Sequence, residues 1–205
     1  MVFAKAPVAG AAKTRLIPLL GAAGAATLHS QLIERALATA RAAAPDALAL
    51  WCTPDAAHPF LQSAAQHYAA GLQIQRGADL GARMAHGFAT TLQQTRYAIC
   101  IGADCPALTP HHLQQAAAAL RTGNDAVFVP AEDGGYALIG LSRAAPELFA
   151  GITWGSATVM TQTRERLREN NLRWHELETL WDVDRPEDYQ RLQQSGLLDD
   201  VPAPG

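Results

Sequence analysis

A short basic segment, 5–16, is the part of the sequence best suited to binding phosphate. It reads K-A-P-V-A-G-A-A-K-T-R-L and contains the cations Lys5, Lys13 and Arg15 together with Pro7 and Gly10. Phosphate groups bind where positive charge and backbone N–H groups converge, commonly at the start of a helix. We therefore expect this loop to bind the phosphates of a ligand, chiefly through Lys13 and Arg15, with Lys5, Pro7 and Gly10 beside them. A solvated basic loop is the alternative.

Other well-known motifs are missing from the sequence. The phosphate-binding loop G-x-x-x-x-G-K-[ST] would need glycine where this chain has Pro7 and Ala12. The basic loop also has no dinucleotide fingerprint G-x-G-x-x-G, and the chain has neither H-E-x-x-H nor G-x-S-x-G. The sequence therefore argues against a P-loop enzyme, an NAD-dependent dehydrogenase, a zinc protease and a serine hydrolase.

Two acidic positions are suited to holding a divalent cation. Asp104 in I-G-A-D-C-P follows the apolar run 97–101, and Asp184 in W-D-V-D-R-P-E-D-Y is one of two acids spaced i, i+2. A carboxylate at the end of a buried strand is costly unless it is exposed in a cleft, hydrogen-bonded or bound to metal. Hard oxygen ligands beside phosphate suit Mg²⁺ or Mn²⁺, so we expect Asp104 and Asp184 to be metal ligands. The alternatives are an Asx-type turn with Pro106 and capping of a helix that Pro186 opens.

The segment E-D-G-G-Y, 132–136, is a candidate for the acceptor side of a reaction. Paired glycines let the chain turn sharply and approach a ligand closely. We expect Asp133 to act on an acceptor or leaving group, with Gly134, Gly135 and Tyr136 beside it. A plain turn between two strands is the alternative, because Asp-Gly is a common turn pair.

A glycine-bearing loop in Q-R-G-A-D-L-G-A-R-M, 75–84, leads into a predicted helix. The first turn of a helix can face anions, so Gly81 and Arg83 are further candidates for binding a nucleotide. The alternative is that Arg83 is a surface residue.

These segments need a scaffold of alternating strands and helices. Apolar runs predict strands or extended chain at 1–4, 47–52, 72–75, 97–101, 125–130, 136–141 and 174–180. Helical spacing and start signals predict helices at 22–44, 59–70, 80–94, 110–121, 156–170 and 186–194. This order is typical of an α/β fold with a mostly parallel sheet and helices on both faces. Ligands of such sheets bind beyond the carboxyl ends of the strands, where the candidate loops lie.

Composition narrows the class of partner. The chain has 205 residues, which suits one domain, expected over 1–198, with a disordered acidic and Pro-rich tail at 199–205. The net charge of −3 and the lack of a long basic cluster argue against nucleic acid as the main partner. Three cysteines without paired short spacing suggest neither a disulfide framework nor a zinc site. We expect no signal peptide and no membrane span, and therefore a cytoplasmic location.

Several of these motifs together resemble the DUF2064 family, also called glycosyltransferase-like or radical-SAM/selenodomain-associated transferases. They are K-A-P-V-A-G-A-A-K-T-R-L, L-G-A-R-M, G-A-D-C-P, D-G-G-Y-A-L-I-G-L and D-V-D-R-P-E-D, spread over 1–192. The chain is also similar, more distantly, to phospholactate guanylyltransferase and molybdenum cofactor guanylyltransferase. Those enzymes share the basic first loop, the Asp after the central strand and the late acidic segment.

The resemblance implies a single-domain nucleotide-diphospho-sugar transferase fold, called GT-A. In such folds a divalent metal is commonly held by the acid after the central strand and by a late acid, which are Asp104 and Asp184 here. Lys13 and Arg15 match the basic positions that bind phosphate. The resemblance thus adds to the expectation that Asp104, Lys13 and Asp133 carry the catalysis and that Mg²⁺ or Mn²⁺ is the cofactor.

The function expected from the sequence is metal-dependent transfer from a nucleotide-activated donor to a small acceptor. Glycosyl transfer from a nucleotide sugar is the first hypothesis. The alternatives are nucleotidyl transfer with release of pyrophosphate, and a non-catalytic protein that binds nucleotides. The sugar, the base, the acceptor and the oligomeric state stay open.

Overall fold

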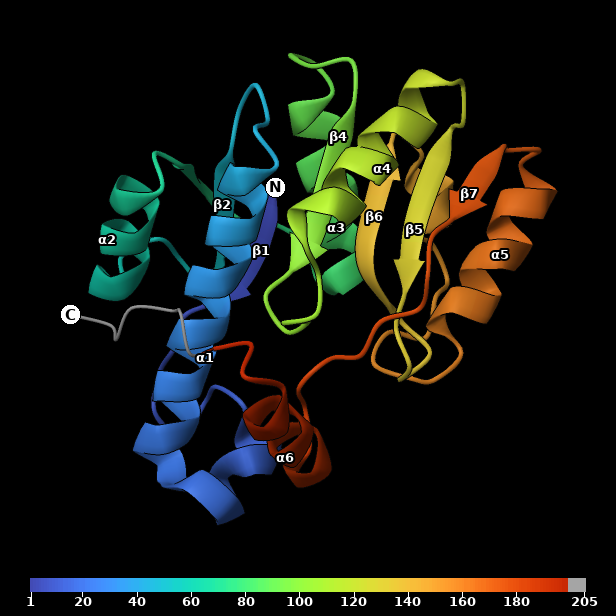
Figure 1. Cartoon of the computed structure of the whole chain (residues 1–205). Helices are drawn as coiled ribbons and strands as arrows, with labels where there is room; N and C mark the ends of the chain where they lie inside the picture. Colours follow the sequence, from blue (N-terminus) through green and yellow to red (C-terminus); the bar gives the residue numbers. More distant parts are fainter. Residues whose placement is uncertain (199–205) are drawn as a thin grey trace. The chain divides into compact units, whose positions relative to one another are not determined.

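Strands and helices alternate along residues 1–198, the part of the chain that the computed structural model describes (Figure 1). The strands are β1 (Val2–Lys5), β2 (Ala49–Thr53), β3 (Gly71–Ile74), β4 (Ala98–Gly102), β5 (Ala126–Pro130), β6 (Tyr136–Leu141) and β7 (Trp174–Glu176). The helices are α1 (Ile17–Ala42), α2 (Pro59–His67), α3 (Leu80–Thr91), α4 (Pro110–Arg121), α5 (Val159–Glu169) and α6 (Pro186–Ser195), with short 3₁₀ helices η1 (Thr14–Leu16) and η2 (Pro146–Leu148). This order confirms the predicted α/β class.

The contacts within the chain divide it into two units. Unit 1 comprises Met1, Gln75–Ile101 and Pro110–Trp181, and unit 2 comprises Val2–Ile74, Gly102–Thr109 and 182–198. A single domain over 1–198 stays a prediction, and the predicted tail 199–205 lies outside the described residues.

Unit 2 is built on three parallel strands in the order β3-β2-β1. The apolar residues of β1 and β2 are buried, and the rings of Phe3 and Trp51 stack with centroids 5.8 Å apart. Helix α1 buries Leu32, Ile33 and Leu37, which follow helical spacing on one face. Because β1 and β2 are parallel, their carboxyl ends meet at one edge, where Lys5 pairs in register with Thr53.

Helix α1 begins five residues before the predicted start at 22, and it is interrupted at Gly21. Gly21 has φ 70° and ψ 165°, which breaks the helical backbone there. Pro18 lies in the first turn, where its missing N–H costs no helical hydrogen bond. The helical spacing of apolar residues in the sequence therefore begins only after Gly21, although residues 17–20 are already helical.

Residues 14–42 form a helix that is long and apolar enough to cross a membrane by length and composition. Core helices pass the same test, and α1 buries Leu28 and Leu32 inside unit 2. The absence of a membrane span stays a prediction.

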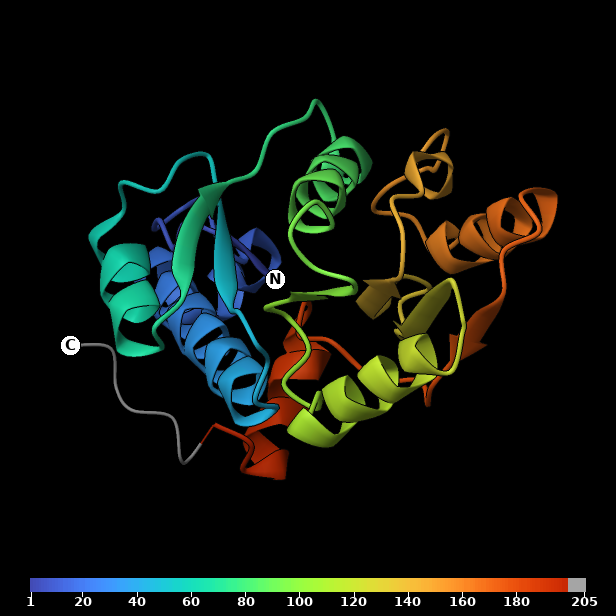
Figure 2. The same cartoon turned by 90° about the horizontal axis from the view of Figure 1, so that it is seen from above.

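Unit 1 is built on four strands in the order β4-β6-β5-β7. Strand β6 is antiparallel to both β4 and β5, whereas β7 is parallel to β5. Helix α4 lies on one face of these strands, and α3 and α5 lie on the other (Figure 2). Of the five described strand pairings, counted over both units, three are parallel, which agrees with the predicted mostly parallel sheet.

The turn between β5 and β6 fits closely against the start of α5. Gly134 has φ +91°, and its carbonyl oxygen accepts a hydrogen bond of 2.8 Å from the N–H of Met160. A Cβ added to Gly134 would lie 2.1 Å from the carbonyl oxygen of Ala157, which is backbone and cannot move aside. Helix α5 starts three residues after the predicted start at 156, because the preceding residues form turns stabilised by the Ser156 hydroxyl.

We expect Gly134→Ala to lower the free energy of unfolding by more than about 3 kcal/mol, because a backbone clash adds to the unfavourable positive φ. Gly155→Ala is the matched control, since Gly155 has φ +79° but nothing within 4 Å of an added Cβ. The control should cost about 1–2 kcal/mol, the price of the positive φ alone. Urea denaturation measures both, and equal losses would show that the Ala157 contact does not constrain the turn.

Candidate active site

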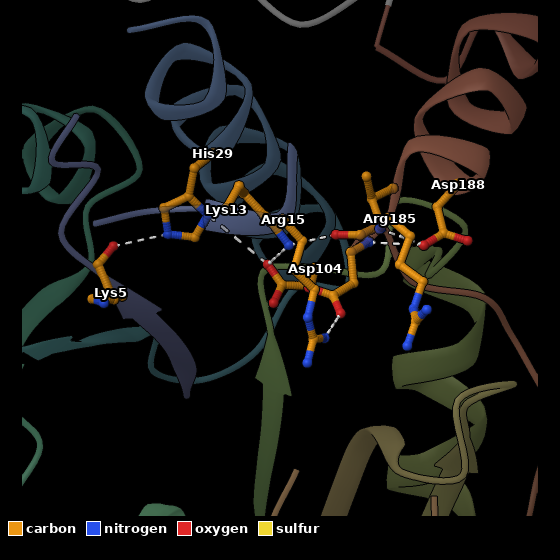
Figure 3. Close-up of polar contacts among 9 residues, drawn as sticks. Lys5, Lys13, Arg15, His29, Asp104, Arg185 and Asp188 are labelled. Atoms are coloured by element: carbon orange, nitrogen blue, oxygen red, sulfur yellow. Dashed lines mark hydrogen bonds and ion pairs between the residues drawn. The ribbon is translucent and has the colours of Figure 1, made fainter. Parts of the chain in front are cut away.

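Two cation–carboxylate pairs lie together in unit 2 (Figure 3). Lys13 Nζ lies 2.7 Å from Asp104 Oδ1, and Arg15 Nη1 contacts Asp184 Oδ2. Lys13 Nζ also donates a hydrogen bond of 2.6 Å to the carbonyl oxygen of Val183. The Lys13 side chain is only 5% exposed, whereas that of Asp104 is 51% exposed. A buried ammonium thus faces a carboxylate that is half open to solvent.

The loop after β1 places Lys13 by turning back on itself. The N–H groups of Ala11 and Ala12 donate to the carbonyl oxygen of Val8 at 2.9 and 3.0 Å. Lys5 Nζ bridges the loop by donating to the carbonyl oxygen of Ala11 at 2.9 Å. Lys13 itself has φ 47° and ψ 46°, a left-handed conformation that costs an L-residue about 1–2 kcal/mol. The 3₁₀ helix η1 starts directly after it, so this strained residue sets the direction of both cations.

Asp104 and Asp184 come from distant segments that a backbone hydrogen bond joins. The N–H of Val183 donates to the carbonyl oxygen of Asp104 at 2.8 Å. The carboxylate of Asp188 accepts the N–H groups of Asp184 and Arg185 at 3.0 and 2.7 Å. The start of α6 is therefore capped by Asp188, and the alternative that Asp184 caps it is wrong. This leaves the Asp184 carboxylate to contact Arg15.

His29 belongs to the same cluster, although the motifs did not indicate it. Its Nε2 lies 3.0 Å from the carbonyl oxygen of Lys5, and its Nδ1 lies 3.9 Å from Asp104 Oδ1. The side chain is 8% exposed, on the face of α1 that also buries Ala25, Leu32 and Ile33. The helical spacing of these apolar residues was the signal that could have located His29, because it puts position 29 on the buried face.

The charges of the cluster depend on one another. Burial by itself raises the pKa of Asp104, but the nearby Lys13 ammonium, with a smaller contribution from His29, brings it below its ordinary value. Burial lowers the pKa of His29, and Lys13 lowers it further, against the opposing charge of Asp104. At neutral pH Asp104 is therefore an anion and His29 is uncharged.

The oxygen atoms at this place suit a divalent cation. The Lys13 ammonium is already held between Asp104 Oδ1 and the carbonyl oxygen of Val183, so these oxygens form a position that accepts positive charge. Residues 1–198 contain no group of three or more His, Cys, Asp or Glu side chains arranged as metal ligands. Two protein carboxylates are nevertheless enough for Mg²⁺ or Mn²⁺, which commonly take their other ligands from water and from substrate phosphates. That Asp104 and Asp184 hold such an ion together stays a prediction.

The other candidates of the basic loop have different positions. Lys5 is exposed. Its carbonyl oxygen accepts the hydrogen bond from His29, and its side chain donates to the carbonyl oxygen of Ala11 within the loop. Pro7 is buried, and Gly10 is exposed with φ +82°. These three residues shape the loop, whereas Lys13 and Arg15 supply the cations that pair with the acids.

The predicted anion site at the start of α3 lies in unit 1. Asp79 already caps this helix, because its Oδ1 accepts the N–H of Ala82 at 2.8 Å. Arg83 Nε donates to the carbonyl oxygen of Gly77 at 3.3 Å. Gly81 is buried against the ring of Trp154, whose Nε1 would lie 2.4 Å from an added Cβ. Gly81 therefore allows close packing, and Arg83 stabilises the loop before the helix.

The predicted acceptor residues also lie in unit 1, at the β5–β6 turn. Asp133 is exposed, and its Oδ1 accepts the N–H of Gly135 at 2.8 Å, as in an Asx turn. The ring of Tyr136 packs edge-on against Phe128 and Trp154. Burial raises the pKa of the Tyr136 phenol. The predicted residues therefore form two sets, with the metal and phosphate candidates in unit 2 and the acceptor candidates, Gly81 and Arg83 in unit 1.

We expect Lys13→Met to lower the free energy of unfolding at pH 7 by about 1–2 kcal/mol, because it removes two hydrogen bonds from a buried charged group. Arg15→Met is the matched control. Its pair with Asp184 is exposed, 60% and 39%, and should contribute less than about 1 kcal/mol. Denaturant titration measures both.

The effect of Lys13→Met should depend on pH. Lys13 lowers the pKa of Asp104, so their pairing stabilises the fold above the ordinary pKa of aspartate, about 3.9, and this stability is lost as the pH falls through the lowered pKa. The difference between wild type and Lys13→Met should therefore shrink when the pH drops from 7 to 3. A difference that is the same at both pH values would contradict the pairing.

Solved structures share this fold. The chain is 31% identical to a protein from Desulfovibrio desulfuricans G20 that carries the provisional name nucleotide-diphospho-sugar transferase, with a TM-score of 0.86 over 95% of this chain and 85% of that one. A nucleotidyl transferase from Methanothermobacter thermautotroptrophicus is 15% identical, with a TM-score of 0.62 over 97% of both chains. The manganese complex of Rv0371c from Mycobacterium tuberculosis H37Rv is 18% identical, with a TM-score of 0.59 over 95% of this chain and 97% of that one.

The similarity to the Desulfovibrio protein confirms the expected nucleotide-diphospho-sugar transferase fold. No curated protein matches this chain. A family model described as "Uncharacterized protein conserved in bacteria (DUF2064)" matches residues 36–156. Since this match spans more than half of the 205 residues, the chain belongs to the DUF2064 family.

Proposed function

We propose that the chain is a transferase that uses a nucleotide-activated donor, with a nucleotide sugar as the preferred donor and a small molecule as the acceptor. The observation that carries this proposal is the pairing of Lys13 with Asp104 and of Arg15 with Asp184. Two cations and two carboxylates at one place are the partners that a complex of diphosphate and metal requires. The name of the Desulfovibrio relative agrees with this chemistry.

The cations are proposed to bind the donor phosphates. Lys13 and Arg15 would exchange their carboxylate partners for phosphate oxygens, and the planar guanidinium of Arg15 can make two parallel hydrogen bonds to one phosphate. Both cations are positioned before the reaction, so they can stabilise the negative charge that grows on the departing nucleoside diphosphate. The left-handed backbone at Lys13 starts the 3₁₀ turn that carries Arg15, so both cations come from one short segment, which supports this proposal.

The carboxylates are proposed to hold the metal. If Lys13 and Arg15 bound the donor phosphates, Asp104 and Asp184 would be left without their cation partners and could hold Mg²⁺ or Mn²⁺. A bound metal would supply Lewis acidity and neutralise charge on the diphosphate. The cluster thus keeps its charge balanced with and without the donor, because the same two acids are paired in both situations.

The β5–β6 turn of unit 1 is proposed to serve the acceptor. Asp133 is exposed and can accept a proton or a hydrogen bond from an acceptor hydroxyl. Arg83 is the candidate of this unit for contact with the nucleotide.

Nucleotidyl transfer is the second candidate function. Three cations in one loop suit a triphosphate, and two structures of the same fold are called a nucleotidyl transferase and 4-diphosphocytidyl-2C-methyl-D-erythritol synthase. In this reaction an acceptor phosphate would attack the α-phosphorus, and pyrophosphate would leave.

The first test is ligand-dependent thermal stability. With Mn²⁺ and a nucleotide ligand at about 100 times its Kd, the melting temperature of wild type should rise by about 5–10 °C. Asp104→Asn should lose this rise. Asp46→Asn, which changes an exposed acid of the same unit, should keep it. Absence of any shift across nucleotide sugars and nucleoside triphosphates would refute a nucleotide-activated donor.

The released product distinguishes the reactions. The reaction is run with the nucleotide ligand that raises the melting temperature. Glycosyl transfer from it releases a nucleoside diphosphate, whereas nucleotidyl transfer releases pyrophosphate. Either rate should fall on the order of 10²–10³-fold in Asp104→Asn, because charge stabilisation at the diphosphate is lost. Binding that is retained in this variant, without turnover in wild type, would instead indicate a non-catalytic nucleotide-binding protein.

A further inference from the structure

We propose that His29 Nδ1 is a nitrogen ligand of the metal site at Asp104, so that this site binds transition-metal ions such as Mn²⁺ in preference to Mg²⁺. This inference rests on the metal site of the proposed function, and it adds a residue that the motifs and the fold did not indicate. It assigns a use to a buried histidine whose ring lies beside the metal-binding carboxylate (Figure 3).

The hydrogen bond to Lys5 decides which ring nitrogen of His29 carries the proton. Nε2 lies 3.0 Å from the carbonyl oxygen of Lys5, and a carbonyl oxygen only accepts hydrogen bonds. Nε2 must therefore be the donor. An uncharged imidazole has one N–H, so Nδ1 carries a lone pair.

The lone pair of Nδ1 accepts no hydrogen bond within residues 1–198. Among the described residues Nδ1 is buried and has no hydrogen-bond partner, and the side chain is 8% exposed. Asp104 Oδ1, which is also an acceptor, lies 3.9 Å from Nδ1. Asp104 Oδ1 is paired with the Lys13 ammonium at 2.7 Å, whereas a buried acceptor such as Nδ1 is unfavourable unless a proton or a cation reaches it.

A metal ion bound by both atoms would satisfy them. The separation of 3.9 Å is shorter than two metal–ligand bonds of about 2.1 Å laid end to end, so one ion can reach Nδ1 and Oδ1 together. Histidines that bind metal commonly donate their other N–H to a backbone carbonyl, which fixes the ring, as Lys5 does for His29. The geometry around His29 is therefore that of a ligand held ready for a metal.

A nitrogen ligand also sets the choice of metal. Mg²⁺ prefers oxygen ligands and octahedral geometry, whereas imidazole suits transition-metal ions, among which Mn²⁺ binds most weakly and Zn²⁺, Ni²⁺ and Cu²⁺ more tightly. In the present structure the Lys13 ammonium lies 2.7 Å from the same Asp104 Oδ1 and competes for that oxygen. Loss of this ammonium should therefore strengthen metal binding, while loss of the imidazole should weaken the binding of Mn²⁺ but not of Mg²⁺.

The test is Mn²⁺ binding to the full chain without nucleotide. Electron spin-echo envelope modulation of the bound Mn²⁺ should show coupling to one ¹⁴N nucleus of an imidazole, and this coupling should vanish in His29→Gln. Glutamine keeps an N–H donor for the Lys5 carbonyl but has no imidazole nitrogen. His67→Gln, at an exposed position of α2 in the same unit, is the control and should keep the coupling.

Affinities give a second readout. His29→Gln should weaken Mn²⁺ binding about tenfold and change Mg²⁺ binding by less than about twofold. Lys13→Met should bind Mn²⁺ more tightly than wild type. Bound Mn²⁺ that requires Asp104 but shows no ¹⁴N coupling in wild type would overturn the inference, as would the absence of Mn²⁺ binding in both wild type and Lys13→Met. If coupling to His29 is found while no nucleotide stabilises the protein, the inference stands and the proposed function fails.

Discussion

The site depends on the ion pair between Lys13 and Asp104. Burying an ammonium to 5% exposure is unfavourable, and the nearby carboxylate and the carbonyl oxygen of Val183 offset that cost. Neighbouring features hold these partners in place. A strained backbone turns Lys13 inward, and Asp188 fixes the chain next to Val183. Lys13 thus links the loop after β1 to the segment after β4, through Asp104, and to the segment before α6, through Val183.

Two acids and two cations that neutralise each other form a site that is complete before any ligand arrives. Such an arrangement limits the cost of rearrangement on binding, because partners are exchanged and no charge is left alone in a buried place. His29 is the exception in the cluster, since its Nδ1 keeps an unmet lone pair. One unsatisfied atom among otherwise paired groups is the kind of local inconsistency that marks function.

Sequence reasoning was most reliable where a local pattern decides the structure. Helix α4 and strand β6 have the predicted bounds, because Pro110 opens the helix and an unbroken apolar run forms the strand. It placed Lys13 and Asp104 in the loops after two strands, where the structure has them, and their roles stay predictions. It could not locate the start of α1, since Gly21 breaks the pattern, nor the cap of α6, since the direction of the backbone decides between two acids. His29 was missed because it lies within an apolar helix face.

The break at Gly21 has a mechanical consequence. It separates the short first turn of α1, which follows the loop carrying Lys13, from the long segment that carries His29. Helical backbone is interrupted at such a point, so the short turn before Gly21 and the long segment after it are two helical pieces and not one continuous rod. An added Cβ at Gly21 would meet no atom within 4 Å, so the positive φ alone, and not close packing, favours glycine at this position. The loop that carries Lys13 and Arg15 is thereby joined to the long segment of α1 through a glycine kink, while His29 lies beyond the kink on the buried face.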